Sequence, residues 1–171
     1  MRTGRNPYDS LLAARVLTDW GNDEGFDFLA AYVDTPTPAG PIVMPHRLRG
    51  YDDTCTQILS VIVRYWARHA DASSEQGELA RARIRKPIET IIRRANDEPF
   101  DIDPMFWLVN DEGFTEYLPA LKEHLAAILK HPELHHWKIA DCAHLLMKID
   151  PDYVTQTLAV HGKTIADFPN K

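Results

Sequence analysis

The sequence has few cysteines and no long apolar run. Its 171 residues include only Cys55 and Cys142, and neither belongs to a Cys-x-x-Cys pair. Both lie in apolar patterns of helical spacing, so we expect buried thiols rather than a disulfide or a redox site. No stretch approaches the about 20 apolar residues of a membrane-spanning helix, and no apolar core with a cleavage site follows the N-terminus. The expectation is a cytoplasmic protein.

The sequence also lacks the short motifs that usually accompany catalysis. It has no Gly-x-Ser-x-Gly elbow, no Gly-x-x-x-x-Gly-Lys-[Ser/Thr] phosphate loop and no Gly-x-Gly-x-x-Gly dinucleotide turn. Acidic pairs such as Asp101 and Asp103 act as general acid and base only in a pocket that separates their pKa values, which a sequence does not show. We therefore expect a non-catalytic protein without a cofactor.

Charge is unevenly distributed along the chain. The formal net charge of −6 disfavours nucleic-acid binding, because that binding depends on lysine and arginine neutralising phosphates. Residues 81–94 nevertheless carry six basic residues against Glu89, a segment charge of +5 that leaves −11 for the remainder. We expect a solvated basic stripe on one amphipathic helix and an acidic surface elsewhere. A phosphate-binding surface on residues 81–94 is the alternative.

Apolar residues recur at helical spacing along most of the chain, as at Cys55, Ile58, Leu59, Ile62 and Trp66. Period-two alternation is absent apart from the short segment 41–45. Asn or Asp precedes proline at 6–7, 103–104 and 150–151, which predicts N-caps there. The pattern predicts an all-α chain with helices near 6–18, 22–34, 51–70, 74–97, 103–109, 115–130, 133–148 and 150–161.

Prolines interrupt this pattern at two places. Pro87 is expected to break or kink the helix at 74–97. A proline-rich loop at 35–50 separates the second and third predicted helices and contains Pro36, Pro38, Pro41 and Pro45. Loops this long in compact domains are often functional.

The pentapeptide Asn-Asp-Glu-Gly-Phe occurs twice, at 22–26 and at 110–114. Its surroundings repeat as well, because Trp20 and Trp107 are 87 residues apart, and so are Cys55 and Cys142. These matches predict a single domain over 1–171 with two similar halves of about 87 residues, near 6–97 and 98–171. In each copy we expect a turn into a helix, with Asn and Asp as caps and glycine supplying an unusual backbone angle.

The segment 110–154, NDEGFTEYLPALKEHLAAILKHPELHHWKIADCAHLLMKIDPDYV, places a helix, a short turn and a second helix before an apolar-Asp-Pro turn. It resembles the HEAT-like helical repeats, and the 47-residue spacing of Ile102-Asp103-Pro104 and Ile149-Asp150-Pro151 fits their period. The resemblance implies a curved stack of antiparallel helix pairs with a concave binding face, and no chemistry. The proline-rich loop and the basic stripe depart from it.

Histidines cluster between His124 and His136, and His131 and His135 have the spacing of a zinc-ligand pair. Pro132 is expected to start a new helix between them, and no His-Glu-x-x-His motif is present. We therefore expect solvated or capping histidines and no bound metal. The acidic segment 19–25 likewise fails as a calcium loop, because Ala30 stands where a bidentate glutamate is required.

The leading functional hypothesis is a non-catalytic module that presents an acidic surface to a basic protein partner. In general character the chain is similar to bacterial immunity proteins, and the resemblance implies neutralisation of a nuclease-like toxin of contact-dependent growth inhibition. Electrostatic attraction would speed the capture of such a toxin. Tyr51 is the expected aromatic anchor. The expected partner-binding residues are Asp23, Glu24, Asp27, Tyr51, Asp52, Asp53, Asp111, Glu112 and Glu116.

Two alternatives stand beside this hypothesis. One is a metal-dependent or nucleic-acid-processing accessory protein that uses the 81–94 stripe and the His124–His136 cluster. The other is a homo-oligomeric scaffold, which would exceed 19.5 kDa in solution without a partner. The four tryptophans are expected mostly in the core, and an exposed one would indicate a binding surface because aromatic residues dominate interface hot spots.

Overall fold

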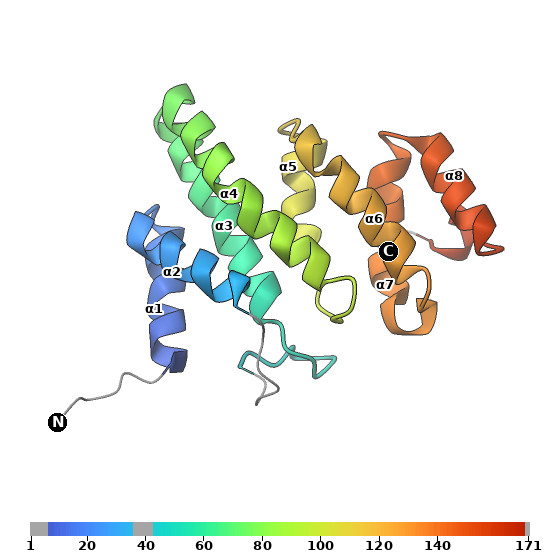
Figure 1. The fold of residues 1–171 in the computed structure, drawn as a ribbon, viewed down its shortest axis with the longest axis horizontal. Helices are drawn as coiled ribbons and strands as arrows, with labels where there is room; N and C mark the ends of the chain where they lie inside the picture. The colour runs from blue at the N-terminus through green and yellow to red at the C-terminus, as the bar shows by residue number, and fades with distance from the viewer. Residues whose placement is uncertain (1–6, 36–42, 170–171) are drawn as a thin grey trace. The chain divides into compact units, whose positions relative to one another are not determined.

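The computed structural model describes residues 7–35 and 43–169, and its regular elements are all helical (Figure 1). The predicted all-α class is confirmed: within these ranges the only extended pairing is an isolated bridge between Pro45 and Asp52. The elements are α1 (Pro7–Asp19), α2 (Asp23–Asp34), α3 (Thr54–Ala72), α4 (Ser74–Arg94), η1 (Asp103–Met105), α5 (Phe106–Asn110), η2 (Thr115–Tyr117), α6 (Leu118–Ile128), α7 (Pro132–Met147), α8 (Pro151–Val160) and η3 (Ile165–Asp167).

Local signals place most helix starts correctly. Asp150 is the N-cap of α8, where its carboxylate accepts a hydrogen bond from the Tyr153 N–H at 3.1 Å. Asp103 instead belongs to a 3-10 turn whose N-cap is Ile102, and Asn6 lies outside the described residues. Of the two outcomes expected at Pro87, the break is wrong, because α4 continues through it, and the kink stays a prediction. Ile84, Ile88 and Ile91 are completely buried on α4, and this burial offsets the hydrogen bond that proline cannot donate.

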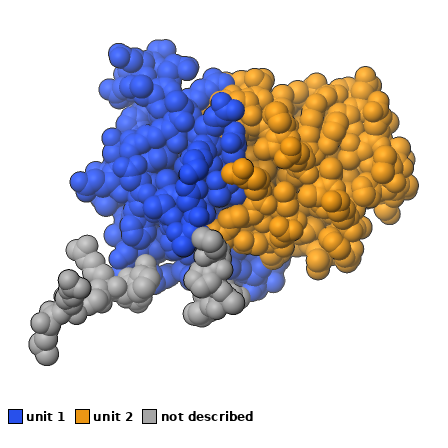
Figure 2. Space-filling model, viewed as in Figure 1, with its two compact units in different colours: residues 1–91 blue, residues 92–171 orange. Residues whose placement is uncertain are grey.

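The chain forms two compact units, residues 1–91 and residues 92–171, with the boundary near the end of α4 (Figure 2). Each unit buries its own set of large apolar side chains. In the first unit these include Leu29 of α2 and Ile58, Leu59 and Ile62 of α3. In the second unit they include Leu108, Leu121, Leu125, Ile139 and Leu146. Cys55 and Cys142 are both buried, as predicted.

Helices α1 and α2 of the first unit cross at Gly25. A Cβ atom added there would lie 2.6 Å from the Cβ of Leu17, 2.8 Å from the Thr18 nitrogen and 2.9 Å from the Ala14 oxygen. Gly25 lies inside α2 and is not among the glycines of positive φ, so the predicted turn angle is wrong at this position. Its glycine is required by space: two backbones approach more closely than any side chain permits.

The second unit is held together by polar contacts as well as by its core. The Lys122 ammonium pairs with Asp150 at 2.5 Å, and the Tyr153 hydroxyl donates to the Lys122 carbonyl at 2.7 Å, which joins α6 to α8. Lys138 of α7 is buried and donates to the carbonyls of Ala95 and Glu98 at 2.5 and 2.9 Å. Burial lowers the pKa of Lys138 to about 8.

Candidate functional site

The two copies of the pentapeptide fold differently. In the first copy Asn22 is the N-cap of α2 and accepts a hydrogen bond from the Gly25 N–H at 3.0 Å. In the second copy Asn110 ends α5, and the turn that follows contains Gly113 with φ +71° and open space within 4 Å of the point where a Cβ atom would lie. Glycine supplies an unusual backbone angle at Gly113, as predicted, but not at Gly25. The predicted similarity of the halves does not extend to the local structure of these repeats.

Two of the expected partner-binding carboxylates in the first unit form ion pairs with an arginine of the same chain. The Arg83 guanidinium lies 2.6 Å from Asp23 and 2.7 Å from Asp27, and the Tyr65 hydroxyl donates to Asp23 at 2.7 Å. Burial, together with the hydrogen bond to Asp23, raises the pKa of Tyr65 to about 12. The Arg83 guanidinium also lies over the Phe26 ring at 5.0 Å. Asp23 and Asp27 therefore neutralise the chain's own cation.

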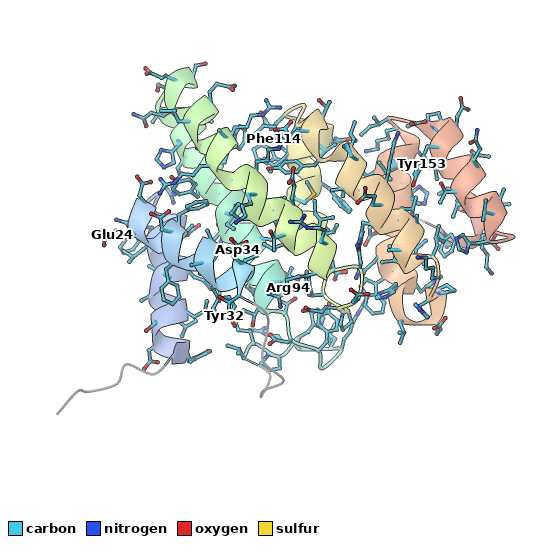
Figure 3. The ribbon with its side chains drawn as sticks, viewed as in Figure 1. Glu24, Tyr32, Asp34, Arg94, Phe114 and Tyr153 are labelled. Carbon is cyan, nitrogen blue, oxygen red and sulfur yellow. The ribbon has the colours of Figure 1, made fainter. Side chains whose placement is uncertain are left out.

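Two further members of the basic stripe, Lys86 and Arg85, also form ion pairs within the chain. Lys86 forms an ion pair with Asp34 at the end of α2, where Asp34 is labelled (Figure 3). Arg85 pairs with Glu89 at 3.0 Å, one turn along α4. These pairs agree with a solvated amphipathic helix, and they reduce the positive charge that a phosphate group would meet.

Asp52 and Asp53 hold the loop that precedes α3. The Asp52 carboxylate accepts hydrogen bonds from the backbone N–H groups of Val43, Met44 and Thr54 at 3.2, 3.3 and 3.0 Å. Burial alone would raise the pKa of Asp52, but these bonds and the one from the Thr54 hydroxyl lower it below its usual value. Asp53 is itself buried and accepts a hydrogen bond from the Gln57 side-chain amide at 2.7 Å. Both carboxylates thus have structural partners in the first unit.

Asp52→Ala is expected to lower the free energy of unfolding by about 1–2 kcal/mol, because three backbone N–H groups lose a charged acceptor. Urea unfolding of the full chain measures this effect. Glu24→Ala is the matched control, since Glu24 is an exposed carboxylate on α2. Equal stabilities of the two variants would contradict the structural role of Asp52.

A groove in the second unit brings acidic and aromatic side chains together. Its volume is about 590 Å³, within the range of about 300–1,000 Å³ typical of ligand sites. The lining residues come from η1, α5, the turn after α5, and α7 with its C-cap: Asp103, Phe106, Trp107, Asn110, Asp111, Asp141, His144, Leu145 and Lys148. Three carboxylates against one lysine give the lining a formal charge of −2 with histidine neutral. We call this site the unit 2 groove.

Hydrogen bonds fix the wall of the unit 2 groove. The Lys148 ammonium donates to the Asn110 side-chain oxygen at 3.1 Å, and the Asn110 amide donates to the Asp111 carboxylate at 2.9 Å. The His144 Nε2–H donates to the Phe168 carbonyl at 2.8 Å, which fixes that tautomer of the ring. The second pentapeptide is thereby tied to α7, and Asp111 is placed in the groove.

Two tryptophans are exposed, contrary to the expectation of a core position. Trp20 is 70% exposed and Trp107 is 41% exposed, whereas Trp66 is buried as expected. Trp107 is followed by Leu108 and Val109, which occupy the buried positions of the short helix α5 and leave the indole at the groove. Sequence reasoning missed Trp107 as a site residue, although its place just before an acidic pentapeptide was a usable signal.

The expected partner-binding residues divide between the two units. Only Asp111 lines the unit 2 groove, and Glu112 lies beside it in the sequence as an exposed side chain. Glu116, in η2, is half-buried. The remaining six lie in the first unit: Asp23, Glu24, Asp27, Tyr51, Asp52 and Asp53. The second unit has thirteen acidic against eight basic residues, whereas the first has twelve against eleven, so most of the net negative charge belongs to the unit that contains the groove.

The histidines do not form one cluster. His131 and His136 are exposed, but His124 and His135 are buried, which corrects the expectation that these side chains are solvated or act as caps. His124 faces Asn96, whose side-chain oxygen lies 2.7 Å from its Nδ1 atom. Within residues 7–35 and 43–169, no three or more histidine, cysteine or acidic side chains are arranged to hold a metal ion.

Comparison of the chain with protein-family models, with curated proteins and with solved structures gives no match. No helix in the described part of the chain has both the length and the apolarity needed to cross a membrane. The binding properties of the protein are therefore inferred from its own residues.

Proposed function

We propose that the protein is a non-catalytic binding module that takes a basic segment of a protein partner into the unit 2 groove. The observation that carries this proposal is the combination, in one groove, of the exposed Trp107 with the carboxylates of Asp103, Asp111 and Asp141. A tryptophan face attracts lysine and arginine cations, and carboxylates accept their hydrogen bonds. The formal groove charge of −2 selects against acidic segments.

The charge distribution supports the same kind of partner. The second unit carries a net five negative charges and the first unit carries one, so the attraction of a basic protein is directed towards the groove-bearing unit. Such attraction speeds association and weakens as salt screens it. Arg83 forms ion pairs with both Asp23 and Asp27 and offsets one of their two charges, which leaves this part of the first unit a poorer match for a basic surface.

The biological form of the proposal is a cytoplasmic immunity-type inhibitor of a nuclease-like toxin. A nuclease must bind phosphates and is therefore basic at its active site, so an acidic groove with an aromatic anchor would bind and cover it. We also propose a HEAT-like arrangement of helix pairs. It is supported by the pairs α1 with α2 and α6 with α7, which pack against each other within their units. The ion pairs of Arg83, Arg85 and Lys86 count against the nucleic-acid-processing alternative.

Trp107→Ala and Asp111→Lys are each expected to weaken partner binding by about 30-fold or more, the effect of losing a hot-spot residue worth about 2 kcal/mol. The measurement is capture from the protein's own cells at low and high salt, identification of a basic captured protein, and titration of that purified protein against each variant. If the partner is a toxin, titration with the wild-type chain should also abolish the partner's enzymatic activity.

Glu24→Lys is the matched control, because it reverses an exposed acidic charge at a residue of the first unit that does not line the groove. It should bind the partner nearly as well as the wild type. A captured protein that binds all three variants equally, or that is acidic, would contradict the proposal.

A further inference from the structure

A tight turn at residues 46–51 of the first unit projects three side chains into solvent. The His46 N–H donates to the Tyr51 carbonyl at 2.8 Å, and the Gly50 N–H donates to the His46 carbonyl at 3.0 Å. Gly50 has φ +73°, a backbone angle that favours glycine and lets the chain reverse. The turn is closed beside the Pro45–Asp52 bridge, so its ends are held together.

The His46 ring makes this turn rigid. Its Nδ1 atom accepts hydrogen bonds from the N–H groups of Leu48 and Arg49 at 3.3 and 3.2 Å. The same ring stacks on Tyr51, with 4.8 Å between the ring centroids. A turn ordered by its own side chains loses little conformational entropy when it binds.

The tip of the turn, residues 47–49, has the sequence Arg-Leu-Arg and is exposed. Leu48 is 91% exposed, more than any other large apolar side chain in residues 7–35 and 43–169. The free energy of the system falls when a partner covers a leucine that an ordered turn holds in water. Arg47 and Arg49 give this tip a charge of +2.

The tip and the unit 2 groove have complementary properties. The tip is basic at both ends and apolar at its centre, whereas the groove lining has a charge of −2 and apolar walls from Phe106, Trp107 and Leu145. A protruding group that matches a recess elsewhere on the same chain produces a head-to-tail contact between copies.

We propose that the Arg47-Leu48-Arg49 tip of one copy docks into the unit 2 groove of a second copy. Leu48 packs on the aromatic wall, and the two guanidinium groups face the carboxylates of Asp103, Asp111 and Asp141. The association is reversible and sensitive to salt, because its charges lie near the surface. Its regulatory consequence, which rests on the proposed function, is that the tip competes with a basic partner for the same groove.

The first test is the mass of the purified full chain in solution, measured by light scattering and sedimentation over a range of concentrations at low and high salt. The proposal predicts a mass that rises above the 19.5 kDa monomer with concentration and falls as salt is added. A monomer at every concentration, or a larger species that neither dilution nor salt changes, would overturn it.

The second test exchanges charges between the tip and the groove. The variant with Arg47→Glu and Arg49→Glu has an acidic tip, and the variant with Asp103→Lys and Asp111→Lys has a basic groove. Each variant alone should stay monomeric, because its tip and groove now have the same sign. An equimolar mixture should associate again, since each tip then meets a groove of opposite charge.

A control separates this effect from a change in net charge. Lys130 and Lys163 are exposed lysines that are not part of the groove, and Lys130→Glu with Lys163→Glu changes the net charge by the same amount as the tip variant. This control should associate as the wild type does. Self-association of either single variant, or a mixture that stays monomeric while both variants keep wild-type circular dichroism, would contradict the proposed contact.

These tests of self-association can fail or succeed independently of the proposed function. A chain that stays monomeric but still captures a basic protein through Trp107 and Asp111 would overturn the self-docking contact and leave the partner proposal intact. A chain that associates by the charge-exchange test but captures no basic protein would support the self-docking contact and overturn the partner proposal.

Discussion

Gly25→Ala is expected to destabilise the first unit strongly, although the substitution adds only one methyl group inside a helix. The new Cβ would lie within 3 Å of the Leu17 Cβ, the Thr18 nitrogen and the Ala14 oxygen. None of these atoms is the end of a flexible side chain, so α1 and α2 must move apart. Overpacking costs about 1–3 kcal/mol and can cost more where backbone must shift, which exceeds the gain of about 0.5–1 kcal/mol from replacing a helical glycine.

Gly113→Ala is the control for this prediction, because it makes the same change in the second copy of the pentapeptide. There is open space around Gly113, and only its φ of +71° opposes a side chain. We expect a cost of about 1–2 kcal/mol from that backbone angle. The free energy of unfolding in urea measures both variants, and hydrogen exchange along α1 and α2 locates the effect of Gly25→Ala. A Gly25→Ala protein as stable as the wild type would refute the steric explanation.

Lowering the pH from about 6.5 towards 3 is expected to destabilise the second unit through His124. Burial, followed by the positive charge of Lys138, lowers the pKa of His124 to about 3, whereas an unfolded histidine has a pKa of about 6.5. Below pH 6.5 the unfolded chain therefore takes up a proton that the folded chain does not. The loss approaches about 1.4 kcal/mol per pH unit and sums to at most about 5 kcal/mol over the window.

The diagnostic range is about pH 6.5 to 5, above the usual pKa values of carboxylates, where the histidine effect amounts to about 2 kcal/mol. Burial also lowers the pKa of His135, which adds to the same slope. Unfolding free energies measured across this range should fall less steeply for His124→Gln than for the wild type. His161→Gln, which changes an exposed histidine, should keep the wild-type slope. A His124→Gln protein with an unchanged slope would contradict the assignment.

Local sequence signals were sufficient for most of the helices. Helical spacing of apolar residues and the cap at Asp150 depend on positions within one or two turns of the chain, and the structure reproduces them. The break expected at Pro87 failed because the apolar face of α4 on both sides of it is fully buried. The core position expected for Trp107 failed because a five-residue helix buries its neighbours Leu108 and Val109 instead.

The sequence by itself determined the all-helical class, the approximate helix bounds and the two buried cysteines. The tertiary structure alone decided which charges are paired, since Arg83 reaches Asp27 across 56 positions of the chain. It also decided that the first pentapeptide begins α2 where this helix crosses α1, whereas the second contributes Asn110 and Asp111 to the wall of an acidic groove. Five identical residues have one set of local preferences, so their different structures follow from the residues that surround each copy, both along the chain and in space.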